Sequence, residues 1–177
     1  MDLGAAGSGE HILLFQSNSI VCSNSQQKVD DFLGYDFVGA PFNQLGGEGG
    51  DISSGLSLRN RSMILDTVQS SNWQAERDYN ENSRDPSIPF EDRWFYNKMK
   101  GLSGVGKPAA RLPSKEVSAS FSVETIWHER PLGYSRVNRW PLEKVDLVDE
   151  WCPEHRIATT DLPPRRKSPR IKRNLQS

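Results

Sequence analysis

Four consecutive apolar residues, Ile12–Phe15, lie near the start of the chain and are followed at once by the polar segment Gln16–Ser19. A continuous apolar run this short is typical of a strand that is buried on both faces, as in a layered α/β sheet. The next apolar residues, Ile20–Cys22, are interpreted as a second short strand or as the far side of a turn. The N-terminal pattern therefore predicts short strands of a sheet.

A helix is expected next. Ser25 can cap its N-terminus, and Gly34 can end it in the left-handed conformation, with apolar residues at helical spacing between them. Tyr35–Val38 is then typical of another strand. The order strand, helix, strand favours α/β layering over a β-sandwich.

The same patterns predict six further elements. We expect a strand at Gly55–Leu58, helices at about 62–70 and from about Glu91, a short helix capped by Ser114, a strand at Phe121–Trp127 and a last helix at Leu142–Trp151. They are assigned to one domain, residues 11–160, with a polar loop insertion at about 71–89. A flexible leader, 1–10, precedes this domain, and a disordered basic tail, 161–177, follows it.

Composition agrees with a single domain that has a modest core and long irregular segments. Mean hydropathy is −0.66, which is polar for a globular protein, yet five Trp, seven Phe and four Tyr are too many for a wholly disordered chain. Six of the 22 basic residues lie in 162–177, so the remaining 161 residues hold 16 basic against 23 acidic groups, a formal charge of −7. An acidic body disfavours nucleic acid as its ligand.

Two cysteines, Cys22 and Cys152, are available, and no CxxC or Cys/His metal spacing occurs. We interpret them as ordinary buried or free thiols. No segment has the pattern of a signal peptide or the roughly 20 apolar residues of a membrane span, so the sequence predicts no compartment.

Three places could carry chemistry. Gln16–Ser19 follows a strand, where α/β folds collect ligands, although a polar turn explains the same residues. Gly55–Arg61 follows a glycine-rich loop, so Arg59 or Arg61 could meet a phosphate; the alternative is a turn with solvated arginines. Glu91-Asp92 could supply a general base, or could simply complement the helix dipole.

Six short motifs then occur in an order that resembles a known family. They are Phe15–Ser19, Tyr35–Pro41, Gly55–Arg59, Glu91–Phe95, Phe121–Thr125 and Pro131–Tyr134. The series is similar to a family of uncharacterised proteins, common in fungi, whose domain of unknown function is related to GT-A glycosyltransferases. The resemblance covers about Ile12 to Ala158 and implies a partial GT-A-like (Rossmann-like) mixed sheet with flanking helices.

The resemblance also implies a ligand and a set of site residues. The expected ligands are a nucleotide sugar and a hydroxyl acceptor, with Mn²⁺ or Mg²⁺ holding the donor diphosphate. Glu91 and Asp92 take the position of the catalytic base, and Asn18 takes that of a metal-binding Asp. The donor- and acceptor-binding residues are expected to be Gln16, Ser17, Ser54, Gly55, Ser57, Arg59 and Trp94.

Three departures from the family pattern weaken the expected site. Asn18 offers a carbonyl oxygen without a charge, Ser135 stands where relatives usually carry a His, and Ser54 stands where they tend to carry Gly. In addition, only about ten residues precede the first strand, so the half of the fold that binds the nucleotide base is expected to be missing.

Two functions follow from these observations. The first is a metal-assisted sugar transferase, and the second is a non-catalytic relative that binds a glycan or a partner. We expect this chain alone to be weak or inactive as an enzyme. Longer relatives are expected to be anchored in the secretory pathway. A role of the basic tail in nuclear targeting or polyanion binding is a third, less favoured idea, since solvated tails are common.

Overall fold

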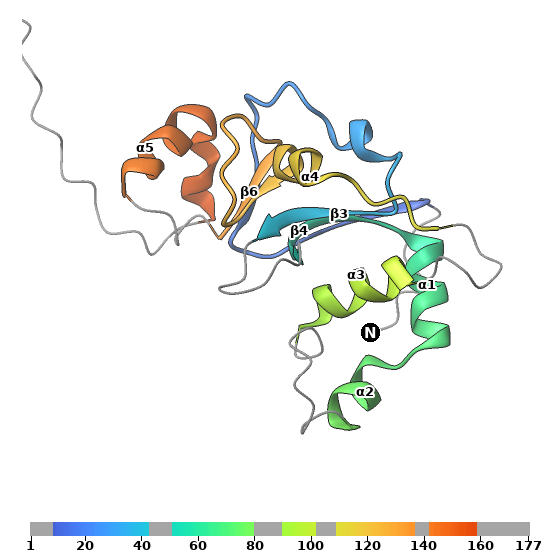
Figure 1. The fold of residues 1–177 in the computed structure, drawn as a ribbon. Coiled ribbons are helices and arrows are strands. Elements are labelled where there is room, and N and C mark those ends of the chain that lie inside the picture. The colour runs from blue at the N-terminus through green and yellow to red at the C-terminus, as the bar shows by residue number, and fades with distance from the viewer. Residues whose placement is uncertain (1–8, 43–50, 80–89, 102–108, 137–141, 159–177) are drawn as a thin grey trace, which may run out of the picture.

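Two three-stranded sheets and five α-helices form the described part of the protein in the computed structural model (Figure 1). The description covers residues 9–42, 51–79, 90–101, 109–136 and 142–158. Residues 1–8 of the predicted leader lie outside it, as do the glycine-rich segment 43–50 and the whole predicted tail, 161–177.

The first sheet has the order β1-β4-β3 and is antiparallel throughout. Its strands are β1 (His11–Phe15), β3 (Phe37–Phe42) and β4 (Asp51–Asn60). The second sheet has the order β2-β6-β5, in which β2 runs antiparallel and β5 parallel to β6. Its strands are β2 (Ser19–Val21), β5 (Ser122–Val123) and β6 (Gly133–Ser135).

The predicted α/β class is therefore confirmed, with the strands divided between two sheets, one of them mixed. The prediction for β1 was right about the strand and wrong about its burial. β1 lies at the edge of its sheet, Ile12–Leu14 are only partly buried, and Phe15 is 70% exposed. An apolar run alone does not distinguish a central strand from an edge strand.

The helices mostly match their predicted positions. They are α1 (Arg61–Ser70), α2 (Trp73–Tyr79), α3 (Glu91–Gly101), α4 (Lys115–Phe121) and α5 (Leu142–Trp151). As predicted, the Ser114 side chain caps α4, accepting a hydrogen bond from the Val117 N–H. α2 occupies part of the predicted loop insertion, of which residues 80–89 lie outside the described ranges.

Two predicted elements are shorter than expected. The helix from Ser25 is only a 3-10 turn, η1 (Val29–Phe32), and a second 3-10 turn, η3 (Pro153–Ile157), follows α5. The strand predicted at Phe121–Trp127 is only Ser122–Val123, because α4 continues through Phe121.

Helices cover both faces of the first sheet. α1 and α3 lie on one face, and α4 lies on the other (Figure 1). The first face packs a cluster made of Phe37, Ile52, Ile64, Trp94, Phe95 and Met99. The second face packs a cluster made of Phe32, Val38, Leu56, Leu58, Phe121 and Leu132.

A bulge in β4 decides which side chains reach which face. Gly39 pairs with Ser57 and the next residue, Ala40, pairs with Ser53, so residues 54–56 have no partner on β3. Three extra residues are an odd number, and side chains alternate along a strand, so the alternation inverts across the bulge. For this reason Ile52 and Leu56, four residues apart, face opposite clusters.

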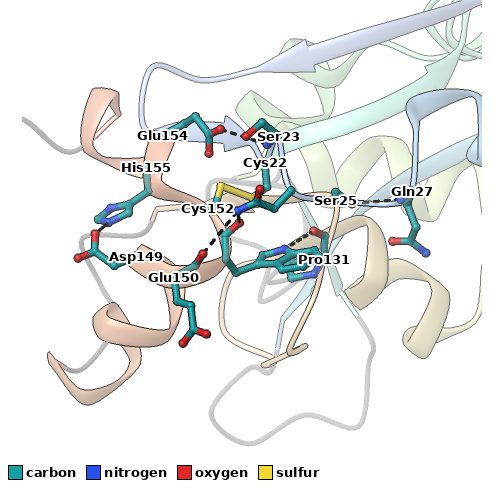
Figure 2. The surroundings of a disulfide bond; sticks show 12 residues. Cys22, Ser23, Ser25, Gln27, Pro131, Asp149, Glu150, Cys152, Glu154 and His155 are labelled. Atoms are coloured by element: carbon teal, nitrogen blue, oxygen red, sulfur yellow. Dashed lines mark hydrogen bonds and ion pairs between the residues drawn. A yellow bond between two sulfur atoms is a disulfide. The ribbon is translucent and has the colours of Figure 1, made fainter.

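The interpretation of the two cysteines as free thiols was wrong. Cys22 and Cys152 form a disulfide with a Cα–Cα distance of 4.8 Å (Figure 2). Both cysteines are buried and pack with Val123, Tyr134 and Val148. Their separation of 130 residues gave the sequence no spacing pattern to recognise. The bond ties the end of β2 to the end of α5.

Polar contacts support the same region. The Ser23 N–H donates to Glu154 Oε1 at 3.3 Å, so the segment after β2 is also held to η3 (Figure 2). Within the α5–η3 corner, Asp149 lies 2.6 Å from His155 Nε2 and 2.9 Å from Arg156 Nη2.

Asp36 organises the start of β3. Its carboxylate accepts hydrogen bonds from the Arg111 N–H at 2.7 Å, from the Arg111 guanidinium at 3.0 and 3.3 Å, and from the Asn60 amide at 3.2 Å. Burial works to raise the pKa of Asp36, but the hydrogen bonds and the charge of Arg111 together outweigh burial and lower it.

Reduction of the disulfide should destabilise the protein. Closing a loop of this length restricts the unfolded chain, and its loss is expected to cost about 3–5 kcal/mol. Thermal unfolding with and without dithiothreitol measures the effect. The Cys22→Ser/Cys152→Ser variant is the control, because its midpoint should be low already and should not respond to the reductant. An equal response of both proteins would contradict the assignment.

Replacing Asp36 should remove a contribution to stability that depends on pH. Because the folded-state pKa lies below the unfolded value of about 3.9, the ionised group stabilises the fold above that pH and loses this effect as pH falls through the folded pKa. Asp36→Asn should cost about 1–3 kcal/mol at pH 7 and less at pH 3. Urea unfolding at both pH values tests this, with the exposed Asp30→Asn as control. A cost that does not change with pH would contradict the prediction.

Candidate functional site

Three residues from distant parts of the chain meet where the two sheets join. The Ser19 hydroxyl donates to the Gly55 carbonyl at 2.6 Å and lies 3.3 Å from the Ser135 hydroxyl. The Gly55 carbonyl also accepts the Gln16 N–H at 2.8 Å. We call Asn18, Ser19, Gly55, Ser135 and Arg136 the sheet junction.

Gly55 is required by the closeness of this contact. A Cβ at position 55 would overlap the Ser135 hydroxyl and would lie 3.1 Å from Ser135 Cβ and 3.4 Å from Ser19 Oγ. The β4 bulge places Gly55 away from β3, so its backbone is free to meet the turn between β1 and β2. Glycine permits this approach because it has no side chain.

Asn18 and Arg136 complete the junction. The Arg136 N–H donates to the Asn18 carbonyl at 3.0 Å, and Arg136 has a φ of 55°, an unfavourable conformation for a residue with a side chain. Its guanidinium pairs at 3.1 Å with the buried carboxylate of Glu124. Asn18 Oδ1 is buried and has no hydrogen-bond partner among the described residues. A buried, unpartnered oxygen beside a strained backbone marks a functional candidate.

A second group of predicted residues lies further along β4. Arg59 is 3% exposed, and its guanidinium contacts Glu91 Oε1 at 2.8 Å and Ser57 Oγ at 3.2 Å. The guanidinium also lies over the rings of Phe37 and Phe95, at 4.8 and 5.5 Å from their centroids. Arg59 is therefore a buried cation with its own counter-ion. It is not a solvated arginine.

Asp92 and Trp94 are positioned by α3. Asp92 lies in the first turn of the helix, half-buried, and accepts a hydrogen bond from the Arg93 N–H at 2.9 Å. Trp94 is 3% exposed, and its indole N–H donates to Glu76 at 2.9 Å. The Trp94 ring thus belongs to the core cluster on the first face of the first sheet, with Lys98 Nζ 5.6 Å from its centroid.

The remaining predicted residues divide between turn and strand. Gln16 and Ser17 are exposed in the turn that leads from β1 to β2. Ser54 lies in the β4 bulge, and its side chain is outside the description. Ser57 is fully buried beside Arg59. The structure therefore brings Asn18, Gly55 and Ser135 together, and separately brings Ser57, Arg59 and Glu91 together.

The residues of the junction do not fit a divalent cation. Such ions prefer charged oxygen ligands. The junction offers an amide, two hydroxyls and a guanidinium, and Glu124 is already paired with that guanidinium. Within the described ranges, no group of three or more His, Cys, Asp or Glu residues could hold a metal ion.

Two surface hollows are described. One, of about 330 Å³, is lined by Asn24, Glu129, Arg130, Leu147, Glu150 and Trp151, none of them a predicted site residue. The other, of about 250 Å³, is mainly apolar and includes Ser19 of the junction.

No helix in the described part of the chain is both long enough and apolar enough to cross a membrane.

Sequence reasoning assigned no individual role to Glu124 or Arg136, and it included Ser19 only as a member of the polar segment Gln16–Ser19. Ser19 and Ser135 are 116 positions apart, so no spacing could connect them. Glu124 lies in the motif Phe121–Thr125, and Arg136 lies two residues after the motif Pro131–Tyr134. Their opposite charges were the one signal in the sequence that could have indicated an ion pair between them.

Gly55→Ala should destabilise the protein by about 1–3 kcal/mol, because the new methyl group overlaps the Ser135 hydroxyl. The double variant Gly55→Ala/Ser135→Gly should recover part of that loss, because Ser135→Gly removes the hydroxyl and the Cβ that the new methyl group would meet. Urea unfolding gives the free energies. Gly34→Ala is the matched control, because a Cβ there would meet nothing within 4 Å. A Gly55→Ala protein as stable as this control would contradict the close approach.

A comparison with known protein families found a match that covers all six motifs of the sequence analysis. A family model described as "Protein of unknown function (DUF5672)" matches residues 5–135, which include every junction residue except Arg136 but neither α5 nor Cys152. No curated protein and no solved structure matches the chain. Since the match spans well over half of the 177 residues, the chain belongs to this family of proteins of unknown function, DUF5672.

Proposed function

We propose that this chain is a glycosyltransferase-like domain that retains part of a nucleotide-sugar site and does not transfer sugar by itself. The observation that carries the proposal is that Asn18 and Ser135 both lie in the sheet junction: the Arg136 N–H donates to the Asn18 carbonyl, and a Cβ at position 55 would overlap the Ser135 hydroxyl. These are two positions at which the GT-A resemblance expects metal ligands, and both carry neutral side chains.

The ligand class comes from the resemblance and is supported by the chemistry of the junction. Hydroxyls, an amide and a guanidinium are suitable partners for the hydroxyls of a sugar or the oxygens of a diphosphate. Asn18 Oδ1 is a buried acceptor without a described partner, which favours a ligand donor at that position. A divalent cation is not part of the proposal, because the carboxylate that would bind it is absent.

The state of the expected base supports a loss of transfer. A general base must reach the acceptor hydroxyl with a free oxygen. One oxygen of each expected base is already engaged: Glu91 Oε1 lies 2.8 Å from Arg59, whose buried charge needs this counter-ion, and Asp92 Oδ1 accepts a hydrogen bond from the Arg93 N–H at 2.9 Å. Trp94, the expected aromatic platform for a sugar, is covered by its neighbours in the core.

The disulfide supports a proposal for the cellular compartment in which the protein folds. Stable disulfides form in oxidising compartments, and Cys22–Cys152 closes the core around β2 and α5. Many GT-A-like enzymes work in the secretory lumen, so we propose that this domain folds there.

Binding and transfer should separate in a direct test. Thermal shift against a panel of nucleotide sugars should show stabilisation by one donor, equal with Mn²⁺ and with EDTA. Asn18→Asp should make the stabilisation depend on Mn²⁺, because it supplies the missing charge. Asn97→Asp, an exposed change of the same charge on α3, should not.

Two results would overturn the proposal. The absence of stabilisation by any donor would reject nucleotide-sugar binding by this chain. Sugar release or transfer by the unmodified chain, abolished in Asp92→Asn while the fold is kept, would show that the domain is an enzyme.

A further inference from the structure

The outer side of β1 presents backbone groups that no described strand pairs with. In the pairing with β4, the Gln16 N–H donates to Gly55 and the Glu10 carbonyl accepts from Arg61. Hydrogen-bonded residues alternate along an antiparallel strand, so the even-numbered residues of β1 face β4. The N–H and C=O groups of His11, Leu13 and Phe15 therefore point away from β4, at the end of the strand order.

Apolar side chains accompany this open edge. Phe15 is 70% exposed and Val21 is 40% exposed. An apolar groove of about 250 Å³ is formed by residues of β1, β2 and β4, namely Leu13, Phe15, Ser19, Ile20, Val21 and Leu56. No residue lining this groove carries a charge, in contrast to the acidic body of the chain.

The edge also lacks the features that keep edge strands from pairing. Proteins usually protect such edges with Lys, Pro, an inward-pointing charge or a bulge. His11–Phe15 contains neither Lys nor Pro nor any acidic residue, and the bulge of this sheet lies on β4, away from the open side. An extended segment can therefore add to β1 without a steric or electrostatic obstacle from the strand itself.

We propose that β1 pairs with β1 of a second copy of this chain, antiparallel across a twofold axis at Leu13. The edge is complementary to itself in this register. Leu13 lies opposite Leu13 of the second copy, and His11 lies opposite its Phe15, so each outward N–H meets an outward C=O. The pairing uses the open edge of both copies, so it closes at a dimer and does not propagate.

Charge favours this occupant over a charged segment. The register places only leucine, histidine and phenylalanine across the axis, so no like charges oppose one another. His11 is already oriented by the contact of its Nε2 with the Tyr35 carbonyl at 3.1 Å. Its ring is thus engaged within its own chain and takes no part in the pairing of the two strands.

Sedimentation equilibrium of the full chain, from low to high micromolar concentration, tests the proposal. The expected mass at high concentration is twice the 20.0 kDa of one chain. Phe15→Pro removes one outward N–H from each copy and leaves the ladder with β4 intact, because that N–H does not face β4. Phe15→Pro should raise the dimer dissociation constant by about tenfold or more, because the dimer loses two hydrogen bonds, one from each copy.

Two further variants keep the test decisive. Phe15→Lys places a charge at the edge and should also give monomers, which decides the question if Phe15→Pro does not fold. Val68→Ala removes another exposed apolar side chain, on α1, and should leave the dimer unchanged. A wild-type chain that stays at 20.0 kDa, or a dimer that survives both Phe15 variants, would overturn the proposal.

Discussion

The contact between the Gly55 backbone and the serines at positions 19 and 135 is the constraint on which the arrangement of the two sheets depends. It exists because a three-residue bulge carries Gly55 away from β3 and because glycine has no Cβ to collide with Ser135. The same bulge inverts the alternation of β4, so the strand supplies apolar residues to both cores of the first sheet. One local irregularity thus places the candidate site and fills two cores.

β2 connects this junction to the rest of the second sheet. Ser19 begins the strand at the junction, and Cys22 follows its other end in the disulfide with Cys152. The strands of the second sheet contain only two or three residues each, so their ladders contribute few hydrogen bonds. Attachment at both ends of β2 compensates for this, and the disulfide also docks α5.

Much of the fold was predictable where the signal is local. The cap at Ser114, the helix Leu142–Trp151 and the acidic first turn of α3 follow from side chains within a few residues of one another, and the structure confirms each. The edge position of β1 was not predictable, because an apolar run records hydrophobicity and not the number of neighbouring strands. Part of the site was predicted through its motifs, although Arg136 and Glu124 were missed.

The sequence by itself determined the α/β class, the positions of α1, α3, α4 and α5, and the neutral character of residues 18 and 135, because these are properties of single residues and short windows. Only the tertiary structure decided that Asn18, Gly55 and Ser135 share one junction, that Arg59 forms an ion pair with Glu91, and that the two cysteines form a disulfide. These contacts join positions from 32 to 130 residues apart, and their formation depends on how the packed sheets bring the chain together.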